Sequence, residues 1–250
     1  MNIRDILESY RNGKMTEEDA EKALRMDYLE NIDGHTVFDH ARQVRKNVPE
    51  VIYALSKTPE MTADIAEASA KRGNVLISRA SIEHFDAVSK RVKSARYIKT
   101  SKMIVIGEPP ASVNGRVGVI TAGSSDMPVA EEAAMMAEYM GCAVVTRFDV
   151  GVAGLHRILE PMKTMLDEDV DCIVVAAGME GALPAVVASL ASVPVIGVPT
   201  STGYGMGGRG EAALMSMLQT CSPGLVVVNI DNGIGAGAAA ALIARKKNMK

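Results

Sequence analysis

Short apolar runs alternate with longer helical segments through the second half of the chain. Five of these runs are rich in β-branched residues and alternate little between apolar and polar positions, which is typical of strands buried on both faces. The predicted strands are 116–121, 142–147, 171–176, 193–198 and 225–230. The predicted helices are 127–140, 155–167, 182–191, 211–220 and 235–247. This alternation predicts an α/β protein whose C-terminal part is a flavodoxin-like three-layer domain with a five-stranded parallel sheet.

The first half of the chain predicts a smaller α/β domain. Its expected helices are 3–12, 16–28, 60–72 and 82–92, and its expected strands are 50–55, 75–78, 95–99 and 103–106. Thr16 stands where an N-cap belongs, with Asp19 three residues later.

Glycine usage divides the chain into two parts. Of its 22 glycines, 4 precede residue 110 and 18 follow it. The segment 107–115 is rich in Gly and Pro and has the composition of a linker. We therefore expect one domain over 1–110 and a second over 111–250.

Composition narrows the range of functions. A chain of 250 residues with 48% hydrophobic and 23% charged residues is expected to be globular, and its net charge of −3 gives no reason to expect nucleic acid or a membrane as partner. Three cysteines without a CxxC pair argue against a disulfide scaffold or a structural zinc site. The first residues lack the apolar core of a signal peptide, and the Gly/Ala-rich run 234–244 is too short to span a bilayer. We expect a cytoplasmic location.

Candidate functional residues gather in the loops that follow the predicted strands, where open parallel sheets bind ligands. Ser124, Ser125 and Asp126 suit a phosphate or ribose at a helix N-terminus, although the same residues are common N-caps. His156 could transfer protons and Arg157 could clamp an anion, or both could lie on an exposed helical turn.

The next two loops carry an acid and a mobile glycine-rich segment. Glu180 follows Gly178 and Met179, and it could be a base, a magnesium ligand or an acid at a helix start. The segment 199–210 has five glycines and could be a lid or a plain connector. It is not a P-loop, because it lacks the lysine and the spacing of that motif. Its candidate residues, together with those after the fifth strand, are Thr200, Ser201, Gly203, Tyr204, Asp231 and Asn232.

Cys221 is the best candidate for a thiol nucleophile. It lies in a turn just before the fifth strand, whereas Cys142 and Cys172 lie at strand starts and are expected in the core. The C-terminal end of a helix is the wrong pole to stabilise a thiolate, so a reactive Cys221 needs help from a cation or an electrophilic substrate.

Several of these segments together resemble a known family. They are 39–58 (DHARQVRKNVPEVIYALSKT), 149–157 (DVGVAGLHR), 177–184 (AGMEGALP), 198–205 (VPTSTGYG), 220–224 (TCSPG) and 228–237 (VNIDNGIGAG). In the second half they look like the phosphoribosyl-aminoimidazole carboxylases. The closer similarity, over nearly the whole chain, is to the LarB family of pyridinium-3,5-biscarboxylic acid mononucleotide synthases, which act in the assembly of a nickel-pincer cofactor.

The resemblance implies a specific reaction. Such enzymes carboxylate nicotinic acid adenine dinucleotide with CO2 and release AMP. Cys221 would add to the pyridinium ring, which answers the objection about the helix pole, and Glu180 or His156 would be the base. Ser124, Ser125, Asp126 and Arg157 would hold ribose and phosphate. Mg²⁺ would neutralise the diphosphate, with Glu180 and Asp231 as possible ligands.

The resemblance extends the substrate site to further residues. Those expected to line it are Gly178, Met179, Thr200, Ser201, Gly203, Tyr204, Asp231 and Asn232. Arg42, Arg45 and Lys57 could reach the anionic substrate or form a solvated cationic face. Because related carboxylases are octamers, we expect a homo-oligomer, with the small residues of 233–241 packing closely at a subunit contact.

Three functions compete on these grounds. The first is the carboxylase and hydrolase acting on the dinucleotide. The second is a phosphoribosyl-aminoimidazole carboxylase or mutase, although the turn at 178–181 lacks the histidine which that family carries. The third is a nucleotide-binding module without turnover.

Overall fold

The computed structural model describes residues 3–24, 29–32, 36–39, 48–49, 51–71, 73–111 and 114–247. The chain divides into two compact units. Unit 1 comprises Met1–Tyr97 and Ile104–Gly107, and unit 2 comprises Ile98–Met103 and Glu108–Lys250.

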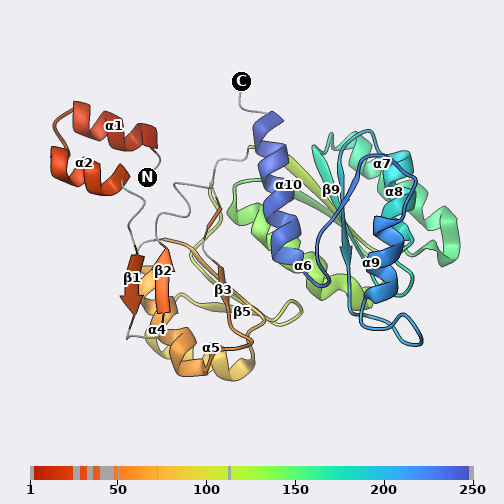
Figure 1. Ribbon diagram of the computed structural model, residues 1–250, viewed down its shortest axis with the longest axis horizontal. Helices are drawn as coiled ribbons and strands as arrows, with labels where there is room; N and C mark the ends of the chain where they lie inside the picture. The colour runs from red at the N-terminus through yellow and green to blue at the C-terminus, as the bar shows by residue number, and fades with distance from the viewer. Residues whose placement is uncertain are drawn as a thin grey trace. The chain divides into compact units, whose positions relative to one another are not determined.

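Unit 2 is built on a five-stranded sheet in which every neighbouring pair is parallel (Figure 1). Its strands are β7 (Arg116–Thr121), β8 (Ala143–Arg147), β9 (Cys172–Ala177), β10 (Val195–Pro199) and β11 (Leu225–Val227). Their spatial order is β11-β10-β9-β7-β8, so the chain leaves β7 on one side for β8 and returns on the other for β9. This is the order of flavodoxin-like folds, and it confirms the predicted fold class.

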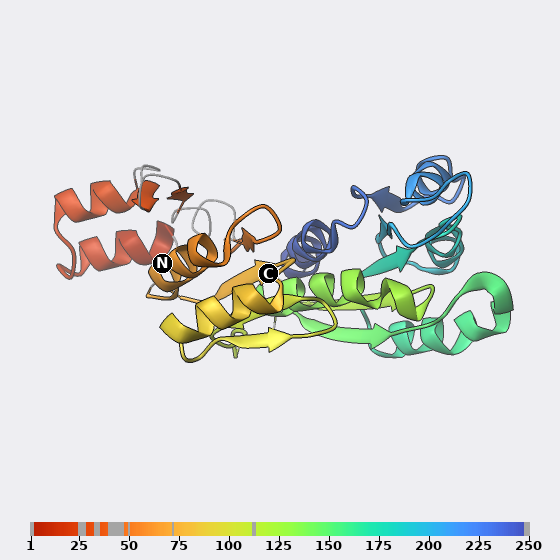
Figure 2. The ribbon, with the colours of Figure 1, turned by 90° about the horizontal axis from the view of Figure 1, so that it is seen from below.

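Helices cover both faces of this sheet (Figure 2). On one face, α6 (Met127–Tyr139) packs against α10 (Gly233–Lys247). The helices on the other face are α7 (Leu159–Asp167), α8 (Leu183–Leu190) and α9 (Glu211–Leu218). They bury Met162, Leu183 and Met217 in one apolar core with the sheet. The 3₁₀ helices η1 (Ser124–Asp126) and η2 (Val152–Ile158) precede α6 and α7.

Two glycines bring α10 unusually close to α6. A Cβ atom at Gly233 would lie 2.2 Å from the carbonyl oxygen of Val129, and one at Gly237 would lie 2.3 Å from that of Ala133. Two glycines of the run 233–241 thus pack within the chain, because α10 shares one sheet face with α6. The subunit contact expected for this run stays a prediction.

Unit 1 holds a four-stranded mixed sheet in the order β3-β4-β6-β5. Its strands are β3 (Val51–Tyr53), β4 (Val75–Ser78), β5 (Arg96–Ile98) and β6 (Met103–Ile106). Its helices are α1 (Ile3–Arg11), α2 (Glu17–Leu24), α4 (Pro59–Ala70) and α5 (Ile82–Arg91). A separate antiparallel pair, β1 (Leu29–Ile32) and β2 (Thr36–Asp39), was not predicted.

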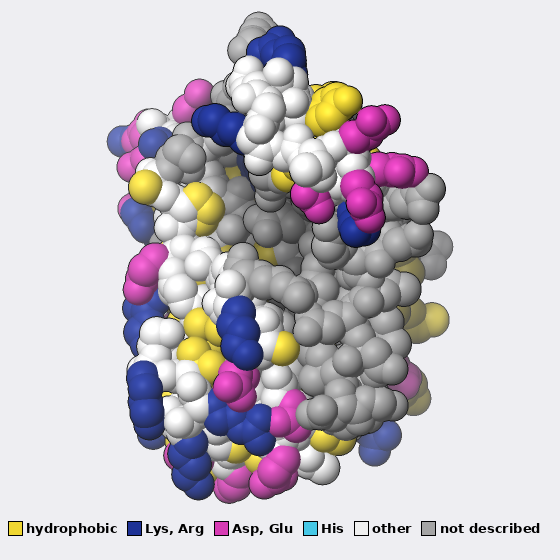
Figure 3. Space-filling view, turned by 90° about the vertical axis from the view of Figure 1, so that its left-hand side faces the viewer, with side chains coloured by type: hydrophobic (Ala, Val, Ile, Leu, Met, Phe, Trp, Pro, Cys, Tyr) yellow, Lys and Arg dark blue, Asp and Glu magenta, His cyan; other side chains and the backbone are white. Residues whose placement is uncertain are grey.

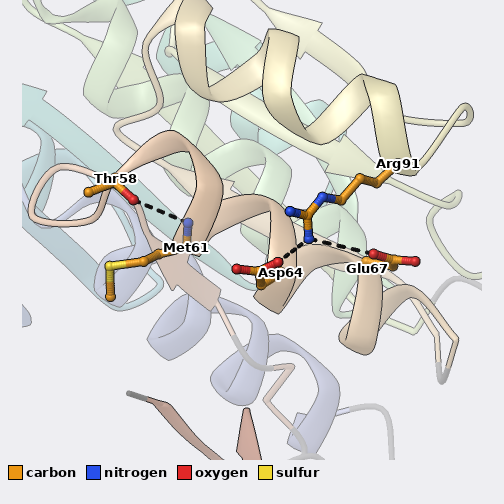
Figure 4. A network of polar contacts seen from close by, with 5 residues as sticks. All are labelled: Thr58, Met61, Asp64, Glu67 and Arg91. Atoms are coloured by element: carbon orange, nitrogen blue, oxygen red, sulfur yellow. Dashed lines mark hydrogen bonds and ion pairs between the residues drawn. The ribbon is translucent and has the colours of Figure 1, made fainter. Parts of the chain in front are cut away.

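Helix α4 is held at its start and along its side (Figure 4). The Thr58 hydroxyl accepts a hydrogen bond from the Met61 N–H at 3.2 Å, which caps the helix. Arg91 of α5 pairs with Asp64 and, at 3.7 Å, with Glu67. These contacts lock α4 against α5 over the apolar core of unit 1.

The charged surface of the described residues is mixed in sign. Lys and Arg side chains lie among Asp and Glu side chains on the face shown in Figure 3. No helix in the described part of the chain is both long and apolar enough to cross a membrane.

Candidate active site

The carboxyl ends of the five parallel strands lie at one edge of the unit 2 sheet, and most of the predicted site residues follow them. The switch point of the topology lies between β7 and β9, which is where ligands bind in open sheets of this kind. The loop after β7 carries Asp126, and the loop after β9 carries Gly178 and Glu180.

Asp126 joins three of these loops. It is 3% exposed, and its Oδ2 accepts the Gly123 N–H at 2.9 Å. Its Oδ1 accepts the hydroxyl of Thr200, which follows β10, at 2.5 Å. Burial raises the pKa of the Asp126 carboxyl, while hydrogen bonds from Thr200, Gly123 and the Gly178 backbone oppose that rise. Asp126 therefore positions the loops and is itself shielded from solvent, and its side chain makes no capping hydrogen bond to α6.

Gly178 is required by the crossing of two loops. A Cβ atom there would lie 2.2 Å from the Thr202 carbonyl oxygen and 2.8 Å from the Thr200 hydroxyl. The Met179 N–H donates to the same Thr202 carbonyl at 2.9 Å. Thr202 was missed by the sequence analysis, and its position between two predicted site residues, Ser201 and Gly203, is the only signal that could have found it.

Glu180 is held out toward solvent by a tight turn. Met179 before it has φ 51° and Gly181 after it has φ 65°, so the chain reverses around the carboxylate. Glu180 is exposed, as are Ser124 and Ser125 on the neighbouring loop and Tyr204 on the segment after β10. These side chains form the accessible rim of the site.

Arg157 and His156 lie in η2, after β8. The Arg157 guanidinium forms an ion pair with Asp149 at 2.9 Å and also donates to the Asp149 carbonyl. The Asp149 N–H in turn donates to the Thr121 hydroxyl at 3.0 Å, which ties the loop to the end of β7. His156 is exposed. An anion at this loop would compete with Asp149 for Arg157.

The loop after β11 is braced to the loop after β10. The Asp231 Oδ1 accepts the Ser201 N–H at 2.8 Å, and the Asp231 N–H donates to the Pro199 carbonyl. The Asn232 side chain accepts the Gly235 N–H at 2.9 Å and so caps α10. Both residues thus support the edge of the site through backbone contacts.

Cys221 does not join these residues within one chain. It lies in the turn that leads into β11, and the carbonyl of Gly224, the last residue of this turn, accepts the Val195 N–H at the amino end of β10. Cys221 is exposed, whereas Cys142 and Cys172 are buried. Burial raises the pKa of the Cys142 thiol to about 11 and that of Cys172 to about 12, as expected for core cysteines.

Of the three basic site residues predicted in the first half of the chain, the structure describes Lys57 alone. Arg42 and Arg45 lie outside the described residues. Lys57 lies between β3 and α4 of unit 1, and its carbonyl accepts the His84 Nε2–H at 3.0 Å. Its role toward a substrate stays a prediction.

No group of three or more His, Cys, Asp or Glu side chains in the described ranges is placed to hold a metal ion. The predicted ligands Glu180 and Asp231 are only two carboxylates, so this finding does not bear on them. Magnesium commonly binds through one or two carboxylates together with substrate phosphates, so their role as ligands stays a prediction.

Comparison with known proteins covers both units. Residues 29–108 match the family described as LarB/PurE-like N-terminal domain, and residues 116–250 match AIR carboxylase. An uncharacterized protein of Methanocaldococcus jannaschii, MJ0165, is 42% identical over 98% of this chain and 97% of its own length. N5-carboxyaminoimidazole ribonucleotide mutases are more distant. The Thermotoga maritima mutase is 34% identical over 51% of this chain and 74% of its own length. The Pyrococcus abyssi mutase is 32% identical over 57% of this chain and 75% of its own length.

Proposed function

Because this chain belongs to the family that joins a LarB/PurE-like N-terminal domain to an AIR carboxylase domain, we propose that it is a pyridinium-3,5-biscarboxylic acid mononucleotide synthase. It would convert nicotinic acid adenine dinucleotide and CO2 to the biscarboxylated mononucleotide and AMP. The observation that carries the proposal is the match over 29–108, because the T. maritima and P. abyssi mutases resemble only 51% and 57% of the chain.

The proposed carboxylation begins with the Cys221 thiolate. Its sulfur adds to a carbon of the pyridinium ring, and an electron pair moves onto the ring nitrogen. The resulting enamine attacks CO2 through carbon and forms the new carboxylate. A base then removes the proton from that carbon, the C–S bond breaks and the thiolate leaves, which restores the aromatic ring. Cys221 suits this role because it is the exposed cysteine of the three.

Glu180 and His156 are the candidate bases. Both are exposed on loops at the carboxyl edge of the sheet, where a bound ring can reach them. Ser124 and Ser125, at the start of η1, offer hydroxyl and N–H donors for ribose or phosphate. Arg157 would exchange its Asp149 partner for a substrate phosphate.

Magnesium enters this proposal with the diphosphate of the substrate. Its charge would balance that of the phosphoanhydride when water cleaves it to release AMP. Glu180 and Asp231 are the carboxylates at this edge of the sheet that we propose to complete its coordination.

The test combines an isotope with matched cysteine variants. Purified protein is incubated with nicotinic acid adenine dinucleotide, ¹³C-bicarbonate and Mg²⁺, and the products are identified by mass spectrometry. We expect AMP and a mononucleotide carrying one labelled carboxyl group, both absent with Cys221→Ala and both retained with Cys142→Ala. Labelled product from Cys221→Ala would remove the covalent step from the proposal.

A second candidate function rests on the mutase relatives. The catalytic half of the chain is 34% identical to the T. maritima mutase, so aminoimidazole ribonucleotide and its carboxylated forms are assayed in parallel. Turnover of these compounds, with none of the dinucleotide and no effect of Cys221→Ala, would replace the proposed function with that one.

A further inference from the structure

The five loops at the carboxyl edge of the unit 2 sheet contain few basic residues. They follow β7, β8, β9, β10 and β11 and span 122–126, 148–158, 178–182, 200–210 and 228–232. With histidine counted as neutral, their charged residues are four acids and two arginines: Asp126, Asp149, Glu180, Asp231, Arg157 and Arg209. The substrate of the proposed reaction carries a diphosphate and a carboxylate. Such an anion needs cations at this edge, because the acids by themselves would repel it.

Of these two arginines, Arg209 is the one whose side chain has no partner among the described residues. Arg157 forms an ion pair with Asp149 at 2.9 Å. Arg209 is exposed, and its guanidinium makes no ion pair or hydrogen bond within the part of the chain that the structure describes. A guanidinium always carries its charge and holds its five N–H donors in a rigid fork. Arg209 can therefore bind an anion without giving up another contact.

The backbone of Arg209 lies close to the end of β10. A Cβ atom on the next residue, Gly210, would lie 2.8 Å from the Thr200 carbonyl oxygen and 2.7 Å from Cγ2 of Ile230, in the loop after β11. Neighbouring Cα atoms are only about 3.8 Å apart, so Arg209 lies near both loops. The Thr200 hydroxyl in turn bonds to Asp126 in the loop after β7. Arg209 therefore borders the loops that hold the other candidate residues.

The backbone at Arg209 adopts a conformation that suits glycine better than arginine. Its φ is 60°, in the left-handed region, which costs free energy for a residue with a long side chain. Glycine stands on either side of it, at 208 and 210, so an arginine at 209 is not needed to make the turn. Strain of this kind gathers at sites that bind ligands. A binding task for the guanidinium would explain why the strained position carries it.

Arg209 is also isolated from other basic residues along the chain. It is the one Lys or Arg between Lys163 and Arg245, a stretch that includes β9, β10, β11 and the loops after them. Its neighbours Tyr204 and Met206 are large and exposed. A surface that only keeps a protein soluble mixes many charges of both signs. One cation among apolar side chains is typical instead of a site that orients a single ligand group.

We propose, on the basis of the function proposed above, that Arg209 binds an oxyanion of the substrate, either the carboxylate of its pyridine ring or its diphosphate. The guanidinium would donate two parallel N–H bonds to two oxygens of that group. Arg157 must first release Asp149 to bind an anion, whereas Arg209 has no such cost. Arg209 would thus raise the affinity for anionic substrates at this edge of the sheet.

Two dinucleotides that differ in one group test this assignment. Nicotinic acid adenine dinucleotide carries a carboxylate on its ring, and the nicotinamide form carries a neutral amide in the same place. Binding of each to the full chain is measured by titration calorimetry without bicarbonate. We expect Arg209→Gln to weaken binding of the acid about ten- to hundredfold, the usual loss for a hydrogen bond to a charged group. A loss confined to the acid identifies the ring carboxylate as the partner, and an equal loss for both identifies the diphosphate.

Arg116→Gln is the matched control. It removes the same charge at the start of β7, on the opposite edge of the sheet, where Arg116 pairs with Glu168 at 2.7 Å, and it should leave both affinities unchanged. Arg209→Lys keeps the charge and loses the fork, so it should restore only part of the affinity. Arg209→Gly relieves the strained φ, so binding should weaken while the midpoint of thermal unfolding does not fall.

Unchanged affinity of Arg209→Gln for both dinucleotides would overturn the inference, as would an Arg209→Gly variant that loses stability and keeps its affinity. Failure of the proposed function gives a different result. Wild type without turnover, whose binding of either dinucleotide depends on Arg209, rejects the reaction and keeps the anion site. Wild-type turnover, with the same KM in Arg209→Gln, rejects the anion site and keeps the reaction. Wild type that binds neither dinucleotide rejects both.

Discussion

The hydrogen bond from Thr200 to Asp126 is expected to be the main stabilising contact of the candidate site. Thr200→Val keeps the shape of the side chain and removes the donor. The lost bond is 2.5 Å long, and both residues are almost fully buried. Losing a hydrogen bond to an ionised group of this kind costs about 1.5–3 kcal/mol.

This cost translates into a clear thermal shift. For a chain of this size each kcal/mol lowers the midpoint of unfolding by about 2–4 °C, so Thr200→Val is expected to lower it by about 3–12 °C. The assay is scanning calorimetry at one protein concentration, because the midpoint of any protein that assembles depends on concentration. Thr164→Val, which removes a half-buried hydroxyl bonded to the side chains of Glu160 and Arg147, is the matched control and should change the midpoint less.

The effect should also depend on pH. Burial raises the pKa of the Asp126 carboxyl above its ordinary value. The protonated form therefore stabilises the folded protein fully at a pH below the ordinary pKa, and this stabilisation is lost as the pH rises through the pKa of the folded state. Thr200 lowers that pKa, so removing it raises the pKa further and makes this loss larger. The difference between wild type and Thr200→Val should therefore grow as the pH rises above the ordinary pKa of an aspartate.

Two results would refute this reasoning. One is an unchanged midpoint for Thr200→Val at neutral pH. The other is an equal effect of Thr200→Val in wild type and in Asp126→Asn, because two residues in one hydrogen bond should couple.

Three further predictions concern the scaffold. Gly237→Ala should lower the free energy of unfolding in urea by up to about 2 kcal/mol, because the clash with α6 outweighs the gain in helix propensity. A more stable variant would contradict the close packing of α10 on α6. Iodoacetamide should label Cys221 in the native protein, and Cys142 and Cys172 only in denaturant, which peptide mass spectrometry can count. His84→Ala should cost about 1–3 kcal/mol, because it leaves the half-buried Lys57 carbonyl and Ser81 N–H without their imidazole partner. A variant as stable as wild type would contradict the role of these two hydrogen bonds.

The strands of unit 2 could be predicted well because each is buried on both faces and therefore reads as an unbroken apolar run. β7 has the predicted bounds, but β11 ends at Val227 rather than at 230 because the chain turns away toward Asp231, whose φ is 56°. The predicted helix at 155–167 begins only at Leu159, since Gly154 has non-helical backbone angles and the residues before Leu159 form η2.

The candidate site was harder to predict than the strands. Its loops could be predicted because side chains that follow parallel strands meet at one edge. The exposure of each side chain could not be predicted in the same way. Asp126 is buried by contact with Thr200, which lies 74 residues away, and no local sequence pattern contains that contact. The sequence contained enough to predict that Cys221 lies apart from the other candidate residues, because it precedes a strand whereas the other candidate motifs follow strands.

The glycines of α10 have a consequence for how unit 2 folds. Glycine inside a helix costs about 1 kcal/mol relative to alanine, and α10 contains Gly235 and Gly237 in addition to Gly233 at its start. Its six alanines favour a helix, but a helix of 15 residues is marginal alone in water even when it is rich in alanine, so its formation and its docking on α6 should be a single event. Until that event the apolar side chains of β7 and β9 on this face stay open to solvent. The step that closes the sheet would therefore also be the step at which an incomplete chain is most exposed to aggregation.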